Sequence, residues 1–556
     1  MKIKNLFVAM LAGAAMVSCS NEDFESGVNN GAIQAGDQAF VSVNIFAPGV
    51  TRATGGFEDG LAAESAVSQA VFLFLDGNYN GCANPFTVSG KDLAWETSTT
   101  NGETKKATTL VIDGIKDEVP AYIVAILNPT KEIKKKFTAS TSLDELKDIV
   151  AHFSTFSTNF VMSNAVYAAG NNKEVVATPI TLDNIAKTKE DLASTTPVTI
   201  QVERVVGKVA VASLDGAISG LNSTGLKETI DDKEDLKLEF VLTGWEVLQN
   251  KEARLIKNID ATDWSIDDVW AGWNDFTLKR SYWANDYTTE NGRTSYLVGS
   301  LTGKDGEYKY VEETVNQKAT SKDALNSASP YLLVSGKFVD ASTKQAVDLV
   351  EWKGQKYTKE GYLNLIAGMA KVSQYYTATT VVTSEGAVTK YTSFTADLLE
   401  LVDNADNDWG ATAMLKKKDE NGNDIEYAFY TVDFLPDGVT VDVNKVQKVE
   451  TPVVEAAIAE FGEVQYWNGG NTYYFAPIKH QAATAATETE PATNFYGVVR
   501  NHVYKMNISS ITGYGTPVAN PNQAIDEPED PTEGDTYMNA EVVILDWRIV
   551  ENNVDL

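Results

Sequence analysis

Residues 70–75 read Ala-Val-Phe-Leu-Phe-Leu, an unbroken apolar run of strand length with turn residues on either side. Similar short runs, either continuous or alternating with polar residues, recur along the chain at Ala121–Leu127, Val198–Val202, Leu238–Leu242 and Tyr331–Val334. Short strands separated by Gly, Asn, Asp and Pro predict a mainly β protein.

Few segments have a helical pattern. The clearest is Ser142–Phe153, where Ser142 and Glu145 form a capping box before an apolar face. Thr358–Ala370 and Val454–Phe461 are two further candidates. A Gly-, Ser-, Asn- and Asp-rich stretch between residues 215 and 235 indicates a change of domain.

The first residues form an export signal. Lys2 and Lys4 precede an apolar segment of about a dozen residues, too short for a membrane span, which needs about 20. Cys19 follows a small residue, where a bacterial lipidating enzyme attaches diacylglycerol, although Met16 stands where leucine is commoner. We expect a palmitate-bearing lipoprotein precursor; the alternative is an ordinary signal peptide with a chance cysteine.

Composition excludes some functions. The net charge of -31 repels phosphate backbones and anionic membranes, so a nucleic-acid partner is not expected. Cys82 is the only cysteine besides Cys19, so a product that lacks Cys19 forms no intramolecular disulfide.

A predicted strand lies directly before a candidate cleavage site. Apolar and polar residues alternate over Ala39–Phe46, and the inward positions are Val41, Val43 and Ile45. A turn-prone stretch follows, in which we expect proteolytic maturation between Arg52 and Ala53. Cleavage there would remove the lipid together with the strand and leave an open groove. The alternative is an ordinary loop arginine.

The C-terminal tail has the character of a donor strand. Residues 517–535 are rich in Pro and acids and predict a linker. Residues 536–556 return to a strand pattern, with candidate donor residues Met538, Ala540, Val542, Ile544 and Trp547. Such a segment fills a partner's groove by strand addition. Because groove and donor lie on different faces, the contact propagates a filament.

Residues for catalysis are sparse. The chain has three histidines, His152, His480 and His502, without metal-motif spacing, and the acidic stretch at Asp419 departs from a calcium loop. We therefore expect no enzyme activity, no catalytic residue, no cofactor and no metal.

Several stretches together resemble the type V pilins of Bacteroidales, most closely the shaft subunit of Porphyromonas-type short fimbriae. The most specific of these stretches are Arg500–Ile508 and the acidic, Pro-rich linker before Thr536–Trp547. The others are Arg52-Ala53, Asn159–Ser163, Val202–Val211 and Tyr331–Phe338. The resemblance implies two transthyretin-like β-sandwich domains with a few short helices and an extended C-terminal strand tail. It also implies export as an outer-membrane lipoprotein, Arg-specific proteolysis at the cell surface and polymerisation by strand exchange.

The expected organisation runs in six parts: a signal peptide at 1–18, a propeptide at 19–52, an N-terminal domain at 53–225, a C-terminal domain at 226–516, a linker at 517–535 and a donor segment at 536–556. The favoured function is a fimbrial shaft subunit in adhesion and biofilm formation. Its expected partners are identical subunits, tip and anchor subunits, an Arg-specific protease and host or bacterial surface receptors. The alternatives are a tip or anchor subunit, or a glycan-binding surface lipoprotein that uses some of its tryptophans and tyrosines, with Trp467 as a candidate.

Overall fold

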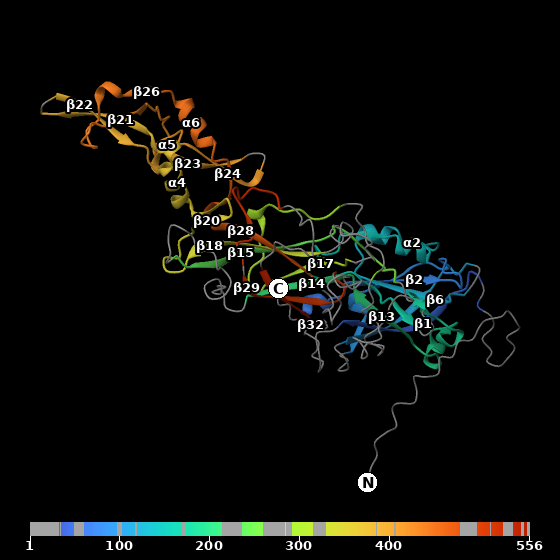
Figure 1. Cartoon of the computed structure of the whole chain (residues 1–556). Coiled ribbons are helices and arrows are strands. Elements are labelled where there is room, and N and C mark those ends of the chain that lie inside the picture. The colour runs from blue at the N-terminus through green and yellow to red at the C-terminus, as the bar shows by residue number, and fades with distance from the viewer. Residues whose placement is uncertain are drawn as a thin grey trace, which may run out of the picture.

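The structure is a computed structural model of the chain. It describes residues 33, 35–48, 61–96, 103–116, 119–169, 173–213, 236–259, 284, 292–314, 330–384, 386–404, 407–478, 497–511, 513–525, 538–545 and 550–552. These residues form three bodies in a row, which we call the N-terminal sheet, the C-terminal sandwich and the inserted module (Figure 1). The predicted mainly β fold with β-sandwich domains and a few short helices is confirmed.

The N-terminal sheet has the strand order β3-β2-β6-β8-β13-β1-β5-β4, with β11 paired to β6 and β12 paired to β1. Its strands are β1 (Ala39–Pro48), β2 (Gln69–Leu75), β3 (Phe86–Ser89), β4 (Ala94–Glu96), β5 (Glu103–Ile112), β6 (Tyr122–Leu127), β8 (Met162–Asn164), β11 (Thr178–Pro179), β12 (Ile185–Ala186) and β13 (Val198–Arg204).

Both faces of β2 are buried, which explains its unbroken apolar sequence. Ala70, Phe72 and Phe74 pack into one core together with β1. Val71, Leu73 and Leu75 pack into a second core on the opposite face. That second core is covered by the short helices α1 (Lys131–Lys135) and α2 (Leu143–Lys147).

Helix α2 is shorter than the sequence predicts. The capping box is present, with the Ser142 N–H donating to Glu145 Oε2 at 2.8 Å and the Glu145 N–H donating to Ser142 Oγ at 3.2 Å. The expected continuation to Phe153 is wrong, because β7 (Val150–Ala151) instead pairs with β16 (Ala253–Arg254). Ala151 pairs with Ala253 and Val150 pairs with Arg254, which are 102 and 104 residues away along the chain. This distant strand partner overrides the local helical pattern.

The C-terminal sandwich packs two sheets around one core. The first has the order β17 (Tyr308–Glu312), β14 (Val206–Ser213), β29 (Val503–Ile511), β31 (Met538–Leu545) and β32 (Val550–Asn552). The second has the order β15 (Leu238–Leu248), β18 (Tyr331–Asp340), β28 (Asn471–Pro477) and β30 (Thr516–Pro517). A separate pair, β9 (Tyr167–Ala169) and β10 (Lys173–Val175), completes the strands of the first half.

The change from one body to the next occurs earlier than expected. Strand β13 ends at Arg204 in the N-terminal sheet, and β14 begins at Val206 in the C-terminal sandwich. The expected boundary at residue 225 therefore differs from the strand pairing by about twenty residues. We place the domain boundary at Val205 on this pairing.

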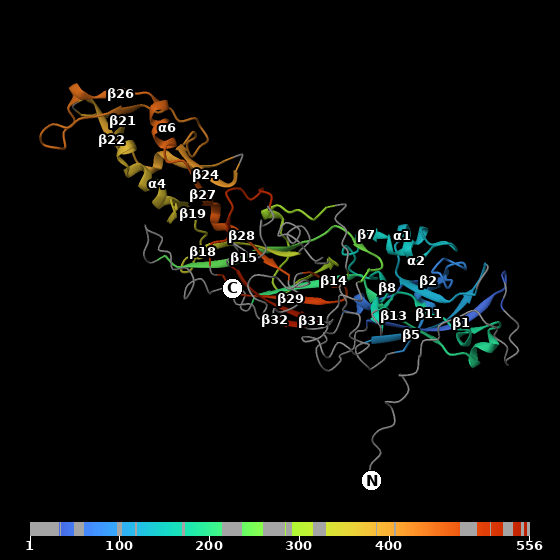
Figure 2. The ribbon, with the colours of Figure 1, turned by 45° about the vertical axis from the view of Figure 1, so that its right-hand side comes forward.

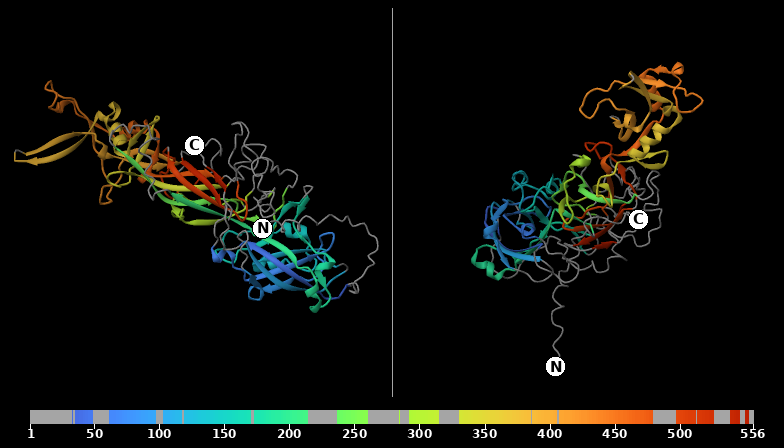
Figure 3. Two further views of the ribbon diagram at one scale, coloured as in Figure 1. Left: turned by 90° about the horizontal axis from the view of Figure 1, so that it is seen from below. Right: turned by 90° about the vertical axis from the view of Figure 1, so that its left-hand side faces the viewer.

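The inserted module lies between β18 and β28 and was not predicted. It holds β19 (Leu349–Trp352), β20 (Gln355–Thr358), β21 (Tyr375–Thr383), β22 (Gly386–Ser393), β23 (Leu399–Asn404), β24 (Asn407–Leu415), β25 (Phe429–Thr431), β26 (Gln447–Val449) and β27 (Glu463–Trp467). The expected helices appear here as α4 (Lys359–Gly368), followed by α5 (Ala370–Ser373), and as α6 (Thr451–Ala459). The module has a hydrophobic core of its own and projects away from the N-terminal sheet (Figure 3).

The beginning of the expected linker belongs to the sandwich. Val518 and Ala519 are buried, and the Asn468 N–H donates to the Val518 carbonyl at 3.0 Å. The chain stays against the sandwich as far as Ile525, whose N–H donates to the Tyr296 carbonyl at 2.9 Å. Within the ranges that the structure describes, no helix combines the length and apolar character that spanning a bilayer requires.

Candidate functional site

Strand β1, which contains the residues expected to be displaced, is an interior strand. It pairs antiparallel with β5 over its whole length, from Ala39 to Pro48. On its other edge it pairs antiparallel with β12 at Phe40 and Val41, and parallel with β13 from Val43 to Phe46. Removing β1 would therefore expose backbone groups on β5 at one edge and on β12 and β13 at the other.

The inward side chains of β1 belong to the main core of the N-terminal sheet. Val41 and Ile45 are 0% exposed and Val43 is 1% exposed. Their core neighbours come from β5, β12 and β13 and include Leu110, Ile112, Ile185, Val198 and Ile200. At about 1.5–3 kcal/mol for each buried Val or Ile, these three side chains contribute on the order of 5–9 kcal/mol. Removing β1 would therefore leave an apolar groove, and another apolar strand could restore the lost contacts.

The expected processing residues lie outside the described residues. These are Cys19, Arg52 and Ala53. Strand β1 ends at Pro48, four residues before Arg52 in the sequence. A cut after Arg52 would leave the whole of β1 on the propeptide side.

The C-terminal tail lies along its own sandwich. Strand β31 pairs antiparallel with β29, and β32 pairs antiparallel with β31 (Figure 2). The four expected donor positions in β31 stand opposite buried residues of β29: Ile544 opposite Tyr504, Val542 opposite Met506, Ala540 opposite Ile508 and Met538 opposite Ile511. The fifth expected donor residue, Trp547, lies outside the described residues. The tail therefore occupies the edge of its own sheet.

A buried polar cluster joins the N-terminal sheet to the C-terminal sandwich. Glu64 is 0% exposed and accepts from Lys208 Nζ at 2.8 Å and from the Tyr310 hydroxyl at 2.6 Å. Burial opposes its ionisation, but the hydrogen bonds from Lys208 and Tyr310 outweigh burial and lower the pKa of the Glu64 carboxyl. The Arg204 guanidinium, also buried, donates to the Glu64 carbonyl at 2.8 Å and to Asn501 Oδ1 at 3.1 Å.

A second cluster surrounds Arg500, which is 0% exposed. Its guanidinium pairs with Glu313 Oε2 at 2.7 Å and donates to the carbonyls of Leu255 at 3.0 Å and Arg254 at 2.8 Å. Nearby, Lys257 Nζ lies 3.3 Å from Glu203 Oε1, and both side chains are fully buried. Burial raises the pKa of Glu203 to about 7 against the attraction of Lys257 and Arg500.

Glu312 in β17 caps a turn of the N-terminal half. The backbone N–H groups of Phe153 and Ser154 donate to Glu312 Oε1 at 2.8 Å and 2.7 Å. Burial raises the pKa of the Glu312 carboxyl to about 8, although these two donors favour its charged form. Glu312 Oε2 has no hydrogen-bond partner among the residues described.

These clusters explain two of the stretches that the sequence singled out. Val202–Val211 and Arg500–Ile508 lie far apart in the chain, yet Arg204 and Asn501 are in direct contact. Their charged and polar side chains hold the N-terminal sheet and the C-terminal sandwich together. The sequence offered no spacing signal for this, because the contact joins residues 297 positions apart.

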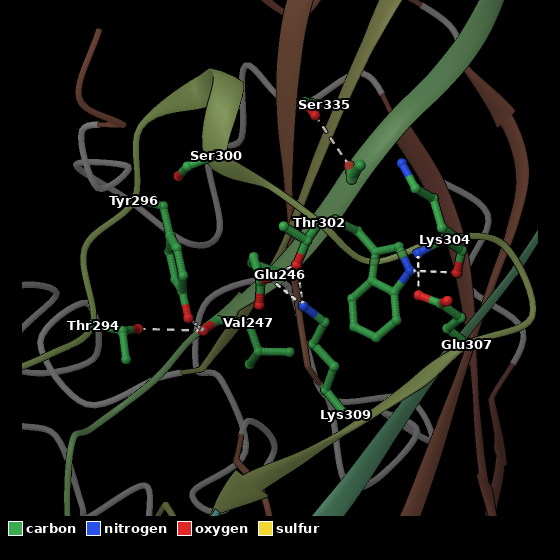
Figure 4. Close-up of polar contacts among 12 residues, drawn as sticks. Glu246, Val247, Thr294, Tyr296, Ser300, Thr302, Lys304, Glu307, Lys309 and Ser335 are labelled. Carbon is green, nitrogen blue, oxygen red and sulfur yellow. Dashed lines mark hydrogen bonds and ion pairs between the residues drawn. The ribbon is translucent and has the colours of Figure 1, made fainter. Parts of the chain in front are cut away.

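The outer edge of β15 is covered by residues 292–309. Trp245 Nε1 donates to the Lys304 carbonyl at 2.7 Å, and Lys309 Nζ pairs with Glu246 (Figure 4). Farther along, the Tyr296 hydroxyl donates to the Val247 carbonyl at 3.2 Å. This cover protects a strand edge that would otherwise be open to another chain.

The structure argues against Trp467 as a glycan-binding residue. Its side chain is 2% exposed, and its Nε1 donates to the Tyr514 carbonyl at 2.9 Å. His502 is also buried, and its Nδ1 lies 2.8 Å from the Arg500 carbonyl oxygen. The Nε2 of His152 lies 3.2 Å from Ser154 Oγ. Within the described part of the chain, no group of three or more His, Cys, Asp or Glu side chains is placed to hold a metal ion.

The comparison with known families bears on the tail and on the part of the sandwich to which it is attached. Residues 465–553 match the model of the family described as major fimbrial subunit protein type IV, fimbrillin, C-terminal. Over these residues the chain is similar to the fimbrillin family. The match begins in β27 and includes β28, β29, β30, β31 and β32, so it covers the tail and the strand on which the tail lies.

Three of the solved structures that can be aligned with this chain have low identity and low TM-scores. A candidate cell adhesion protein from Parabacteroides distasonis is 11% identical with a TM-score of 0.39, over 91% of this chain and 96% of that chain. The fimbrilin of Porphyromonas gingivalis is 13% identical with a TM-score of 0.35, over 92% and 98%. The C-terminally truncated tip fimbrial protein Mfa3 of the same species is 11% identical with a TM-score of 0.33, over 91% and 100%. No curated protein matches the chain.

Proposed function

We propose that this protein is a structural shaft subunit of a cell-surface fimbrium, without enzyme activity. It is made as a precursor lipid-anchored to the outer membrane through Cys19 and is cut between Arg52 and Ala53. The cut releases β1, and the tail of a second subunit takes its place. The resulting filament serves adhesion and biofilm formation and joins tip and anchor subunits at its ends.

One observation carries this proposal above all. Strand β1 is an interior core strand that ends four residues before the candidate cleavage site. A single cut after Arg52 therefore removes a complete structural element and not a loose end. The groove that β1 leaves has an apolar surface and two strand edges with unpaired backbone groups, and both favour the binding of an incoming strand.

A tip subunit or an anchor subunit is less compatible with the sequence. A tip subunit needs no donor tail, and an anchor subunit keeps its lipid and lacks a cleavable arginine. This chain has both a tail matched by the fimbrillin family and Arg52.

The test is proteolytic activation of the purified precursor. Treatment with an Arg-specific protease should give SDS-resistant ladders and filaments visible by electron microscopy. Arg52→Ala, or deletion of residues 536–556, should abolish both. Val542→Asp should also stop growth, whereas Val543→Asp, on the opposite face of the same strand, is the matched control. A precursor that is cut after Arg52 and stays monomeric would refute the proposal.

A further inference from the structure

We propose that the incoming tail occupies the place of β1 in one defined register and direction. Met538, Ala540, Val542 and Ile544 of one subunit take the positions of Ala39, Val41, Val43 and Ile45 in the next. The tail runs in the direction of β1. This inference rests on the proposed function and identifies the partner as a second copy of the chain, aligned residue by residue.

The two strands have matching inward sequences. β1 reads Ala39-Phe-Val-Ser-Val-Asn-Ile-Phe46, and β31 reads Met538-Asn-Ala-Glu-Val-Val-Ile-Leu545. At every second position β1 presents Ala, Val, Val and Ile, all buried, and β31 has Met, Ala, Val and Ile. The last two positions are identical, so the proposed register preserves Val and Ile where the core contains Val43 and Ile45.

The register that β31 already has on β29 identifies its inward positions independently. Directly opposed residues in an antiparallel pair lie on the same face of the sheet. Tyr504, Met506 and Ile508 are buried in the core of the sandwich, and they stand opposite Ile544, Val542 and Ala540. The backbone register thus places Ala540, Val542 and Ile544 on one face of the strand, as the proposed register requires.

Other registers fit less well. A shift by one residue turns Glu541 toward the core. A shift that brings Ile544 to the position of Val43 carries Asp546 to the position of Ile45, which is 0% exposed, so an unpaired charge would be buried. The opposite two-residue shift places Ala540 at Val43 and Val542 at Ile45, which removes methyl groups from a close-packed core.

The direction follows from the strands that remain. β5 pairs with β1 antiparallel and β13 pairs with β1 parallel, and the two arrangements use differently spaced hydrogen bonds. A tail that runs in the same direction as β1 can form the same antiparallel hydrogen bonds with β5 and the same parallel hydrogen bonds with β13. A reversed tail would require both neighbours to change their pattern, and it would place Met538 where the core holds the β-branched Ile45.

The remaining two positions differ in compensating directions. Met538 is larger than Ala39, and Ala540 is smaller than Val41. These positions are adjacent on the same face of the strand, so the total side-chain volume changes less than either position alone. A flexible methionine suits such a site.

Disulfide trapping tests the register. In β1, Phe40 pairs with Val111, Ser42 with Thr109 and Asn44 with Ala107. In the proposed register Asn539 takes the place of Phe40 and stands opposite Val111. The separation of directly opposed Cα atoms, about 4.5–5.5 Å, is within disulfide range.

The experiment mixes two pools of precursor in a Cys82→Ala background and cuts them with an Arg-specific protease, which also removes Cys19. The donor pool carries Asn539→Cys. Three acceptor pools carry Val111→Cys, Thr109→Cys or Ala107→Cys. Reducing gels first establish that each pool forms ladders, and non-reducing gels after boiling in SDS and urea then detect cross-linked dimers.

We expect cross-linking with Val111→Cys and at least tenfold less with the other two acceptors. Cross-linking mainly at Thr109→Cys would show a two-residue shift, and cross-linking mainly at Ala107→Cys would show a reversed strand. Ladders without a cross-link at any acceptor would also overturn the register while leaving strand exchange intact. Absence of ladders in every pool would refute the proposed function, and the register with it.

Discussion

Truncation of one side chain in β1 should destabilise the precursor and leave the mature subunit unchanged. Ile45 is 0% exposed and packs in the core of the N-terminal sheet. Replacing a buried Ile with Ala costs about 2–5 kcal/mol, since it removes buried carbons and leaves a cavity. In a domain of 150–250 residues, each kcal/mol lowers Tm by about 2–4 °C, so the precursor should lose roughly 4–20 °C.

The mature subunit supplies the decisive comparison. After cleavage and release of β1, the Ile45→Ala and wild-type chains have the same sequence, so calorimetry should give the same Tm for both. If the weakened contacts govern release of the cut strand, assembly should also start about 30-fold faster at 2 kcal/mol, because 1.4 kcal/mol corresponds to a factor of ten.

The matched control is Asn44→Ala, at the neighbouring and partly exposed position of the same strand. It should lower the Tm of the precursor far less than Ile45→Ala does. A precursor with Ile45→Ala whose Tm falls by less than about 2 °C would refute the reasoning that β1 is a core strand. An equal loss of Tm in the cleaved protein would show that the cut strand stays bound, and it would refute the release of β1.

Three further predictions concern buried groups. Burial raises the pKa of Glu312 to about 8, whereas in the unfolded chain this carboxyl releases its proton near its ordinary pKa of 4.5. The stability that the protonated Glu312 contributes is therefore fully present below pH 4.5 and is lost as the pH rises toward 8. Glu312→Gln should reduce this fall without abolishing it, because burial also raises the pKa of Glu203, to about 7. Urea titrations at pH 5, 7 and 9 that show equal losses of stability in both proteins would contradict it. Lys208→Met leaves Glu64 buried without its cation and should lower the free energy of unfolding in urea by about 3–5 kcal/mol. Lys135→Ala breaks an exposed ion pair and should lower it by less than about 1 kcal/mol. Similar losses for the two variants would count against a stabilising role of the buried cluster. Cys82 is 4% exposed, so its thiol should react with Ellman's reagent only in denaturant. Rapid labelling of the native protein would show that the N-terminal core opens.

Local patterns in the sequence predicted many of the elements. The run at 70–75 lies within β2, and Thr358 begins α4 by accepting from the Gly361 N–H at 3.1 Å. Val41, Val43 and Ile45 are buried as their alternation indicated. These features depend on neighbours within a few residues, and the chain encodes them directly.

Long-range features were missed because strand partners are not written in local patterns. The inserted module divides β18 from β28, which are neighbours in one sheet although the whole module separates them along the chain. The buried contact between Arg204 and Asn501 joins two halves of the chain. Neither the insertion nor this contact can be predicted from residues that are close together in the sequence.

The position of the inserted module has a consequence for how this protein can diverge. β18 and β28 are direct neighbours, and Lys337 pairs with Asn471 at the point where the module leaves and returns. The two attachment points thus lie one strand spacing apart. Most of the module packs around a core of its own, and of its buried residues that the structure describes only Leu349 and Trp467 belong to the core of the sandwich. Its surface can change in sequence and length while the sheet beneath keeps its pairing. A filament of such subunits would carry the surface of the module at regular intervals. The residues on that surface could change without affecting the strand contacts that join one subunit to the next.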